Sequence, residues 1–169
     1  MTQPMTVNRR ASAPVHGQAS RQYLAFVLDG ETYAMEIRSI KEVIQYGALT
    51  RVPMMPAFIR GVINLRGAVV PVLDLAVRFG RGAREPSRRT CVVVLEVDHP
   101  GGALALGFLV DQVRAVLDIA AADIEPPPAF GGSLRSDFLE GIGKVDGEFM
   151  ILLDVDRVLS VEELSEISA

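Results

Sequence analysis

The sequence is short of the residues on which several common functions depend. Its 169 residues contain one cysteine, two histidines and no tryptophan, and only 6% are aromatic. A single cysteine, Cys91, excludes a disulfide framework within the chain and favours a reducing compartment. Few aromatic side chains leave little for nucleobases to stack on, so we do not expect a nucleic acid partner.

Long apolar runs are absent as well. No stretch approaches the roughly 18–20 apolar residues that a membrane-spanning helix needs. No apolar segment follows the N-terminal arginines, as it would in a secretory signal. We therefore expect a cytoplasmic protein without direct membrane insertion. Residues 1–20 are rich in Ser, Ala, Pro, Thr and Gln and are predicted to form a flexible tail.

Positive charge is scarce outside this tail. The net charge is −4, but residues 1–21 hold three arginines and no acid, so the remaining 14 basic and 21 acidic residues give −7. Nucleic acid binding depends on basic faces that neutralise phosphates, and an acidic body argues against it. The hydrophobic fraction of 49% is high enough for a packed core.

One segment occurs twice. Residues 58–80 return without a gap as residues 138–160, with the turn glycines and the apolar pattern kept together, which indicates one structural unit built twice. The identical positions pair Phe58 with Phe138, Gly61 with Gly141, Gly67 with Gly147 and Asp74 with Asp154. At the turn, residues 64–66 (NLR) become residues 144–146 (KVD). The charge changes sign there, which suggests that the function of the two hairpins differs at this point.

Short apolar runs between turn residues predict an all-β fold. Asp29-Gly30 favours a tight hairpin, and residues 61–65 and 68–75 form another around Arg66-Gly67. Residues 37–45 fit a helical turn and a strand equally well. Each half holds about five strands, which predicts two pseudo-repeated five-stranded β-barrels, SH3-like or OB-like, with short helical turns.

The predicted organisation follows the repeat. The first barrel covers about residues 21–80, an arginine-rich linker residues 81–89, and the second barrel about residues 90–158. Ser160 and Glu163 resemble a capping box and predict a short C-terminal helix over residues 160–167. Barrels of this size are marginal alone, so we expect a shared apolar interface. Pro71 lacks a backbone donor and is expected at a sheet edge or a bulge.

The chain offers no residues with the spacing of a catalytic or metal site. His16 lies in the tail and His99 beside a glycine turn, while Cys91 lies in an apolar strand where a thiol is inert. Asp74 and Asp154 occupy equivalent positions and could form a paired-carboxylate site. Because each ends an apolar strand before a short turn, we interpret them as caps of free backbone N–H groups. We predict no enzymatic activity, no metal and no cofactor.

Motifs spread along the chain match one family. Residues 56–61 read PAFIRG, residues 61–67 GVINLRG and residues 70–75 VPVLDL, and residues 33–44 and 107–117 fit the same pattern. Together they resemble the CheW-like family of chemotaxis adaptors over about residues 20–165. The resemblance implies two five-stranded barrels around a shared core. It also implies a non-catalytic adaptor that couples the histidine kinase CheA to the cytoplasmic tips of methyl-accepting chemoreceptors.

The resemblance also implies where such an adaptor works. It would be a monomer when free and would be recruited from the cytoplasm to membrane-associated receptor arrays. It would bind the regulatory domain of CheA, itself CheW-like, through barrel-to-barrel contacts. A face of the first half is the expected kinase surface, but the sequence assigns no kinase-binding residue.

Six residues match family positions connected with receptor coupling. Arg66 and Glu42 are expected to approach within ion-pair distance and to shape a binding surface, although composition alone describes Arg66 as a solvated turn residue. Ile40, Cys91 and Val116 match positions near the cleft between the barrels, where they would have to be accessible to bind a receptor tip. The competing interpretation places these three in the core. Gly61 belongs to the same motif.

Two other functions fit the same sequence. One is the same module in a non-flagellar chemosensory array, such as a twitching-motility system. The other is a double β-barrel that binds oligonucleotides or a small ligand, which the acidic charge and scarce aromatic residues disfavour.

Overall fold

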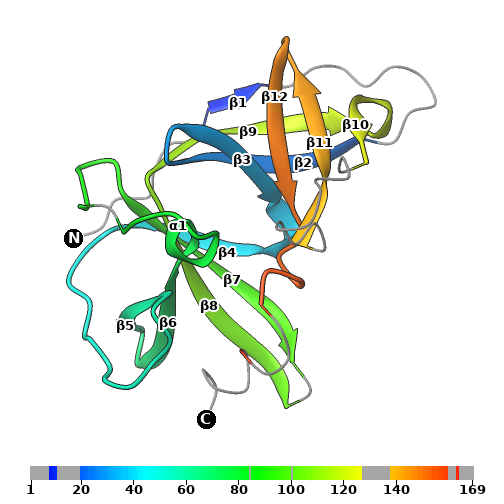
Figure 1. Cartoon of the computed structure of the whole chain (residues 1–169). Coiled ribbons are helices and arrows are strands. Elements are labelled where there is room, and N and C mark those ends of the chain that lie inside the picture. Colours follow the sequence, from blue (N-terminus) through cyan, green and yellow to red (C-terminus); the bar gives the residue numbers. More distant parts are fainter. Residues whose placement is uncertain are drawn as a thin grey trace.

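The computed structural model describes residues 8–10, 20–83, 85–99, 101–126, 138–159 and 163. Two β-sheets make up most of this part of the chain, one above the other in Figure 1. The all-β class predicted from the sequence is therefore confirmed. No helix within these residues is long and apolar enough to cross a membrane.

The elements are short and follow the predicted turns. In chain order they are β1 (Asn8–Arg10), β2 (Ser20–Leu28), β3 (Glu31–Glu36), the 3-10 helix η1 (Ile37–Ser39), β4 (Ile40–Gln45), β5 (Ile59–Leu65), β6 (Ala68–Asp74), α1 (Leu75–Arg78), β7 (Cys91–His99), β8 (Gly102–Val110), β9 (Gln112–Ala120), η2 (Ala121–Asp123), β10 (Ile124–Glu125), β11 (Leu139–Val145) and β12 (Glu148–Leu153). Residues 37–45, which fitted both patterns, thus form a helical turn over residues 37–39 and a strand over residues 40–45.

The repeated segments fold into hairpins with one register. In the first hairpin Ile59 faces Leu73, the register shifts before Gly61, and Leu65 faces Ala68. In the second hairpin Leu139 faces Leu153, with the same shift before Gly141, and Val145 faces Glu148. Both turns place two residues at positive φ, 53° and 86° at Arg66-Gly67 and 50° and 78° at Asp146-Gly147. These are the values of a type I′ hairpin turn, which glycine at the second position favours.

The two sheets do not correspond to the two halves of the chain. Seven strands pair in the order β1-β9-β2-β3-β12-β11-β10, and five in the order β4-β7-β8-β6-β5. Hairpin β2–β3 of the first half therefore lies with β9–β12 of the second half. Hairpin β7–β8 of the second half lies with β4–β6 of the first.

The exchange is symmetrical. Leu152 of β12 pairs with Ala34 of β3, and Val72 of β6 pairs with Gly107 of β8, both in parallel. Because positions 72 and 152 are equivalent in the repeat, β3 and β8 are equivalent too. The first hairpin of each half, β2–β3 or β7–β8, thus pairs with strands of the other half.

The predicted division into barrels at about 21–80 and 90–158 was therefore wrong. Hydrophobic periodicity identifies strands but not the strands that they pair with. A barrel of one half alone would bury too little apolar surface to be stable, whereas the exchange joins both halves through one core. Although β6 lies between β5 and β8, Pro71 precedes the part of β6 that pairs with β8 and lies at a local edge of the sheet, as predicted. Its missing donor is tolerated because pairing with β8 begins only at Val72.

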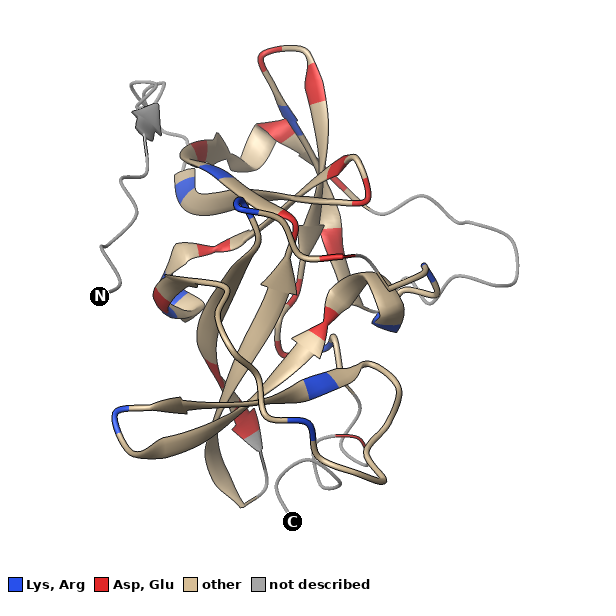
Figure 2. Cartoon of the chain, turned by 90° about the vertical axis from the view of Figure 1, so that its left-hand side faces the viewer, with Lys and Arg blue, Asp and Glu red and all other residues tan. Residues whose placement is uncertain are grey.

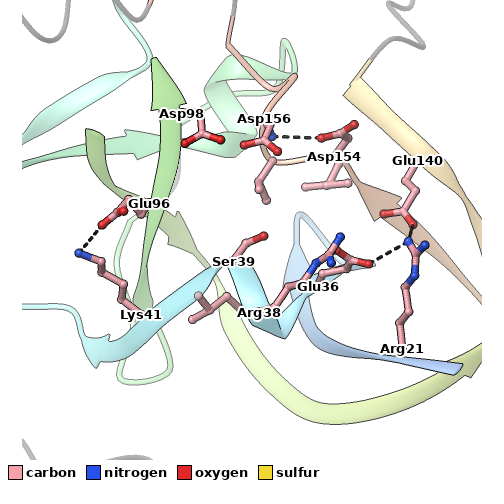
Figure 3. A pocket seen from close by; sticks show the side chains of 13 residues that line it. Arg21, Glu36, Arg38, Ser39, Lys41, Glu96, Asp98, Glu140, Asp154 and Asp156 are labelled. Carbon is pink, nitrogen blue, oxygen red and sulfur yellow. Dashed lines mark hydrogen bonds and ion pairs between the residues drawn. The ribbon is translucent and has the colours of Figure 1, made fainter. Parts of the chain in front are cut away.

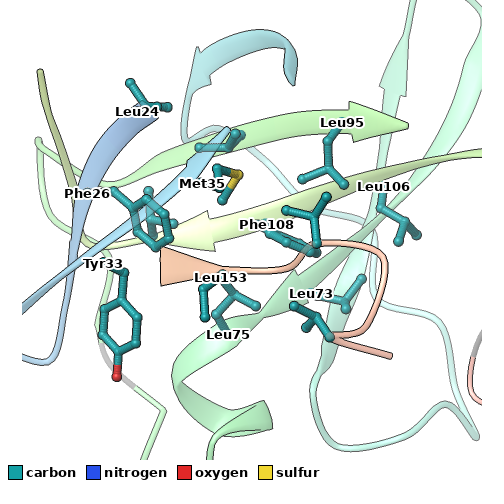
Figure 4. Close-up of a cluster of buried hydrophobic side chains, with 14 of the residues drawn as sticks. Leu24, Phe26, Tyr33, Met35, Leu73, Leu75, Leu95, Leu106, Phe108 and Leu153 are labelled. Carbon is teal, nitrogen blue, oxygen red and sulfur yellow. The ribbon is translucent and has the colours of Figure 1, made fainter. Parts of the chain in front are cut away.

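The largest core cluster lies where the two sheets meet (Figure 4). Phe26 and Met35 come from the seven-stranded sheet, and Leu73, Leu95 and Phe108 from the five-stranded sheet; all five side chains are fully buried. A row of four stacked rings crosses the same region. Ring centroids are 6.0 Å apart for Phe26 and Tyr33, 5.9 Å for Tyr33 and Phe79, and 4.8 Å for Phe79 and Phe138. This is the shared apolar interface that the sequence predicted.

The two ends of the chain differ from expectation. Residues 8–10 form β1, which pairs in parallel with β9, so the prediction of a flexible tail was wrong for these three residues. The rest of residues 1–19 lies outside the described residues. Of the predicted helix at 160–167 only Glu163 is described, and Arg78 Nη2 donates to its Oε1 at 3.1 Å.

Candidate functional site

A cleft of about 680 Å³ opens beside η1 and the start of β4 (Figure 3). The side chains around it come from both sheets, so the exchange of hairpins builds its walls. The lining residues are Arg21, Glu36, Arg38, Ser39, Ile40, Lys41, Glu96, Asp98, Glu140, Leu153, Asp154, Val155 and Asp156. Ile40, Leu153 and Val155 supply an apolar floor, and charged side chains form the rim.

The rim is predominantly acidic, with six carboxylates and three cations. Arg21 lies 3.0 Å from Glu36 and 3.5 Å from Glu140, and Arg38 lies 2.7 Å from the second oxygen of Glu36. Lys41 pairs with Glu96. These pairs hold the cations beside η1 and β4, on the wall opposite the aspartates.

Three aspartates gather on that opposite wall. Figure 3 shows Asp98, Asp154 and Asp156 on neighbouring segments facing the cleft. Burial raises the pKa of Asp156, and the nearby carboxylates of Asp154 and Asp98 raise it further. An acidic wall of this kind suits a partner that presents lysine or arginine side chains. Within the described residues no group of three or more His, Cys, Asp and Glu side chains could hold a metal ion.

Arg66 and Glu42 form the ion pair expected from the sequence. Arg66 Nη2 lies 2.8 Å from Glu42 Oε2, with exposed side-chain fractions of 76% and 25%. The type I′ turn directs Arg66 outward, and the Asn64 side chain accepts a hydrogen bond from Gly67 N at 2.9 Å. The other carboxylate oxygen of Glu42 is buried and has no hydrogen-bond partner among the described residues. The pair fixes a basic tip on this hairpin, while the equivalent turn holds Asp146. Figure 2 shows one hairpin that ends in a basic residue and another that ends in acidic residues.

Cys91 and Val116 are core residues. Their exposed fractions are 1% and 6%, and both belong to the cluster between the sheets. The expectation that they line an accessible surface was wrong, because both strands turn these side chains inward. Burial raises the pKa of the Cys91 thiol, as expected of an inert cysteine. Ile40 is only partly buried and lines the cleft, so it alone of the three is accessible.

Gly61 is a packing glycine. It is buried, and a Cβ atom there would lie 2.5 Å from the carbonyl oxygen of Thr50. Gly141 has the same close approach, 2.5 Å to the carbonyl oxygen of Glu125. Each glycine lets a further stretch of chain lie against its hairpin.

Asp74 and Asp154 both cap the turn that follows their strand. Asp74 Oδ1 accepts from Val77 N at 3.3 Å, and Asp154 Oδ1 accepts from Asp156 N at 3.1 Å. Asp74 is buried and lies 3.5 Å from Arg60. Burial raises its pKa, while the hydrogen bonds and Arg60 oppose that rise. The two carboxylates follow hairpins of different sheets, which supports the interpretation as caps.

Comparison with known proteins decides the family. The model of the CheW-like domain matches residues 22–163. The chain belongs to the CheW-like family. The chemotaxis protein CheW of Klebsiella aerogenes is 35% identical over 160 residues, which cover 95% of this chain and 92% of that protein. Protein FrzA of Myxococcus xanthus is 31% identical over 141 residues, covering 82% and 85%.

A solved CheW structure has the same fold. The scaffolding protein TtCheW from Thermoanaerobacter tengcongensis superimposes with a TM-score of 0.76 at 34% identity, covering 86% of this chain and 96% of that one. This CheW-like chain therefore shares with TtCheW both its fold and clear sequence similarity over most of its length.

Sequence reasoning missed two groups of residues in this CheW-like chain. The aspartates of the cleft come from the end of β7, in the five-stranded sheet, and from the turn after β12, in the seven-stranded sheet. Exposed apolar side chains were the second group: Val52, Met54, Val69 and Phe149. One signal was available, since Val69 and Phe149 occupy equivalent positions in the repeat and are 71% and 64% exposed.

Proposed function

We propose that this chain is a non-catalytic adaptor that couples a CheA-type histidine kinase to the cytoplasmic tips of chemoreceptors. Beside the family membership, the observation that carries the proposal is the position of β4. Its residues Ile40 and Glu42 reach two accessible features, the floor of the cleft and the ion pair at the β5–β6 turn. One strand thus connects two surfaces to which a receptor could bind.

The cleft is the proposed receptor site. A helical hairpin tip binds by inserting apolar side chains into a groove, and Ile40, Leu153 and Val155 provide an apolar floor of suitable kind. The acidic wall of Asp98, Asp154 and Asp156 would select tips with basic side chains next to the apolar ones. Arg66 would contact the same receptor from the hairpin turn.

The exposed apolar side chains near the five-stranded sheet are the proposed kinase surface. Val69 on β6 is 71% exposed, and Val52 and Met54 in the loop before β5 are 40% and fully exposed. Barrel-to-barrel docking needs accessible apolar residues of this kind. A contact here leaves the cleft open, so one monomer would hold both partners, each with about micromolar affinity. Joint binding then raises the effective concentration of each partner for the other.

Reconstitution tests the proposal. The purified chain, cognate CheA and receptor-containing membranes are mixed, and CheA autophosphorylation is followed with and without the chain. We expect a clear rise only when all three components are present, and co-sedimentation of the chain with the membranes. Unchanged CheA activity in the complete mixture would show that the chain is not its adaptor.

Ile40→Asp and Val69→Asp separate the two surfaces. Ile40→Asp should abolish co-sedimentation with receptor membranes and keep CheA binding, while Val69→Asp should do the reverse. Phe149→Asp is the matched control for Val69→Asp, because it introduces the same charge at the equivalent exposed position. A common loss in all three variants would point to misfolding, which circular dichroism would reveal.

The same adaptor role in a twitching-motility array would use the same surfaces. Complementation distinguishes the pathways: the gene should restore swimming in one deletion strain or surface motility in another. The oligonucleotide-binding alternative is opposed by the six carboxylates around the cleft. Binding of single-stranded nucleic acid at low salt, measured by fluorescence anisotropy, would reverse that judgement.

A further inference from the structure

The loop before β5 presents a methionine side chain to solvent. Met54 is fully exposed, at 101%. The other methionines that the structure describes are shielded, since Met35 and Met150 are buried in the core and Met55 is partly buried. Met54 is therefore the described methionine that solvent reaches most freely.

The turn that carries Met54 is held in place from both sides. Before it, Thr50 exchanges backbone hydrogen bonds of 3.0 and 2.8 Å with Val62 of β5. After it, the side chain of Met55 packs against the core cluster between the sheets. Pro53, directly before Met54, restricts the backbone further. Because the loop is fixed in this way, the side chain of Met54 is kept outside the core.

The backbone at Met54 is strained. Its φ is 66°, in the left-handed region that glycine and asparagine occupy most readily. Proline followed by a residue at positive φ is the pattern of a type II turn, in which glycine is favoured at the second central position. Methionine at this position adds strain and leaves an apolar side chain in water, and neither stabilises the fold. Such an outlier indicates a role in binding.

A methionine contact can be switched off by oxidation. Its flexible thioether fills irregular apolar pockets. Hydrogen peroxide converts it to a sulfoxide: the sulfur gives an electron pair to one peroxide oxygen, the O–O bond breaks and an S–O bond forms. The proton of that oxygen moves to the other, which leaves as water. The sulfur is oxidised and the peroxide is reduced. The sulfoxide is polar, and methionine sulfoxide reductases reverse the change.

We propose that Met54 is a reversible oxidation site, at which peroxide weakens the docking of the kinase. The inference rests on the kinase surface proposed above, to which Met54 and Val52 belong. Unoxidised Met54 inserts into an apolar pocket on the regulatory domain of CheA, and its sulfoxide does not. The core is left intact, because Met35 and Met150 are shielded from the oxidant.

Mass spectrometry tests the site. The full chain is treated with dilute hydrogen peroxide, and the oxidised fraction of each methionine is followed over time. Met54 should react at least about tenfold faster than the buried Met35 and Met150, because exposure governs the rate. CheA, at concentrations at which it binds the chain, should slow the oxidation of Met54. Equal rates at the three methionines, or a rate at Met54 that bound CheA leaves unchanged, would overturn the proposal.

Calorimetry tests the consequence for binding. The chain is oxidised, catalase removes the peroxide, and the affinity for CheA is compared with that before treatment. Oxidation should lower the affinity of the natural chain about tenfold, and methionine sulfoxide reductase should restore it. Met54→Leu cannot form a sulfoxide and keeps Met1 and Met5, so peroxide should not change its affinity, whatever the starting value. Met55→Leu is the matched control and should show the same tenfold loss on oxidation as the natural chain.

Two failures are distinguishable in these experiments. If the untreated chain does not bind CheA at all, the proposed kinase surface is wrong, and the role of Met54 falls with it. If the untreated chain binds CheA and complete oxidation of Met54 leaves the affinity unchanged, only the oxidation site loses its role.

Discussion

Arg66 combines high exposure with a fixed position. Its side chain is 76% exposed, and its ion pair with Glu42 lies at the tip of a hairpin rather than in the core. Exposed pairs contribute little to stability because solvent screens them and the side chains lose freedom. The same geometry presents an ordered guanidinium to a partner.

Arg66→Ala should therefore leave the melting temperature almost unchanged and weaken receptor coupling about tenfold, the size of effect typical of a residue at the centre of an interface. Lys144→Ala at the equivalent hairpin is the matched control and should change neither property. Thermal unfolding and membrane co-sedimentation are the measurements. A large fall in melting temperature for Arg66→Ala would make it a structural residue.

Asp74 affects the stability of the protein in two ways, as the cap of α1 and as a buried carboxyl group. As the cap of α1 it accepts a hydrogen bond from Val77 N, so Asp74→Ala should destabilise the protein by about 1 kcal/mol. Burial raises its pKa above the value in the unfolded chain. The folded state then holds this proton more tightly, so the carboxyl contributes stability below about pH 4 and loses it as pH rises through the raised pKa.

Asp74→Asn retains an acceptor and cannot ionise. The stability difference between the natural protein and Asp74→Asn should therefore be larger at about pH 4 than at pH 7. Urea unfolding at a series of pH values measures it. Asp154→Asn makes the same substitution at the equivalent capping position and is the matched control. A difference that grows with pH would contradict the assignment.

At the scale of single elements, Gly61 decides how the loop at Thr50 meets β5. Thr50 and Val62 exchange backbone hydrogen bonds of 3.0 and 2.8 Å, which bring the Thr50 carbonyl against Gly61. Gly61→Ala forces a Cβ to within 2.5 Å of that oxygen and should cost about 2 kcal/mol. Gly47→Ala meets nothing within 4 Å and is the matched control. The denaturant midpoints of the two variants should differ clearly. Equal midpoints would show that the loop at Thr50 moves away from the added methyl group without loss of stability.

The hairpins were the most predictable elements. Their turn glycines and alternating apolar residues set the register, and the structure has the same register in both copies. The ion pair of Arg66 and Glu42 followed from the family resemblance. The burial of Cys91 and Val116 could not be decided in the same way, because an apolar residue in a strand fits a core and a groove equally. Their place depends on which sheet covers them.

For the whole molecule, the exchange of hairpins is the feature that the sequence did not reveal. Nothing in the local pattern of residues 20–36 indicates that this hairpin pairs with β9 and β12 instead of with the strands that follow it. Long-range partners are chosen by the fit of whole sheets, which a single sequence does not display.

The exchange predicts how the divided molecule behaves. Fragments 1–83 and 84–169 each lack strands of both sheets, so neither should give a dispersed NMR spectrum alone. Mixed or co-expressed, they should associate and recover the spectrum of the intact chain. A control cut after residue 126 should leave a fragment that keeps every strand of the five-stranded sheet. Independent folding of fragment 1–83 would contradict the observed pairing.

The exchanged hairpins also set the moment at which the chain acquires its structure during synthesis. Hairpin β2–β3 leaves the ribosome early, yet β12, its parallel partner, is translated more than a hundred residues later. At ordinary elongation rates this is a delay of about 10 s. Until β9 is translated, the apolar strand Ser20–Leu28 can pair only with β3. Nascent chains should therefore depend on holding chaperones until translation is nearly complete.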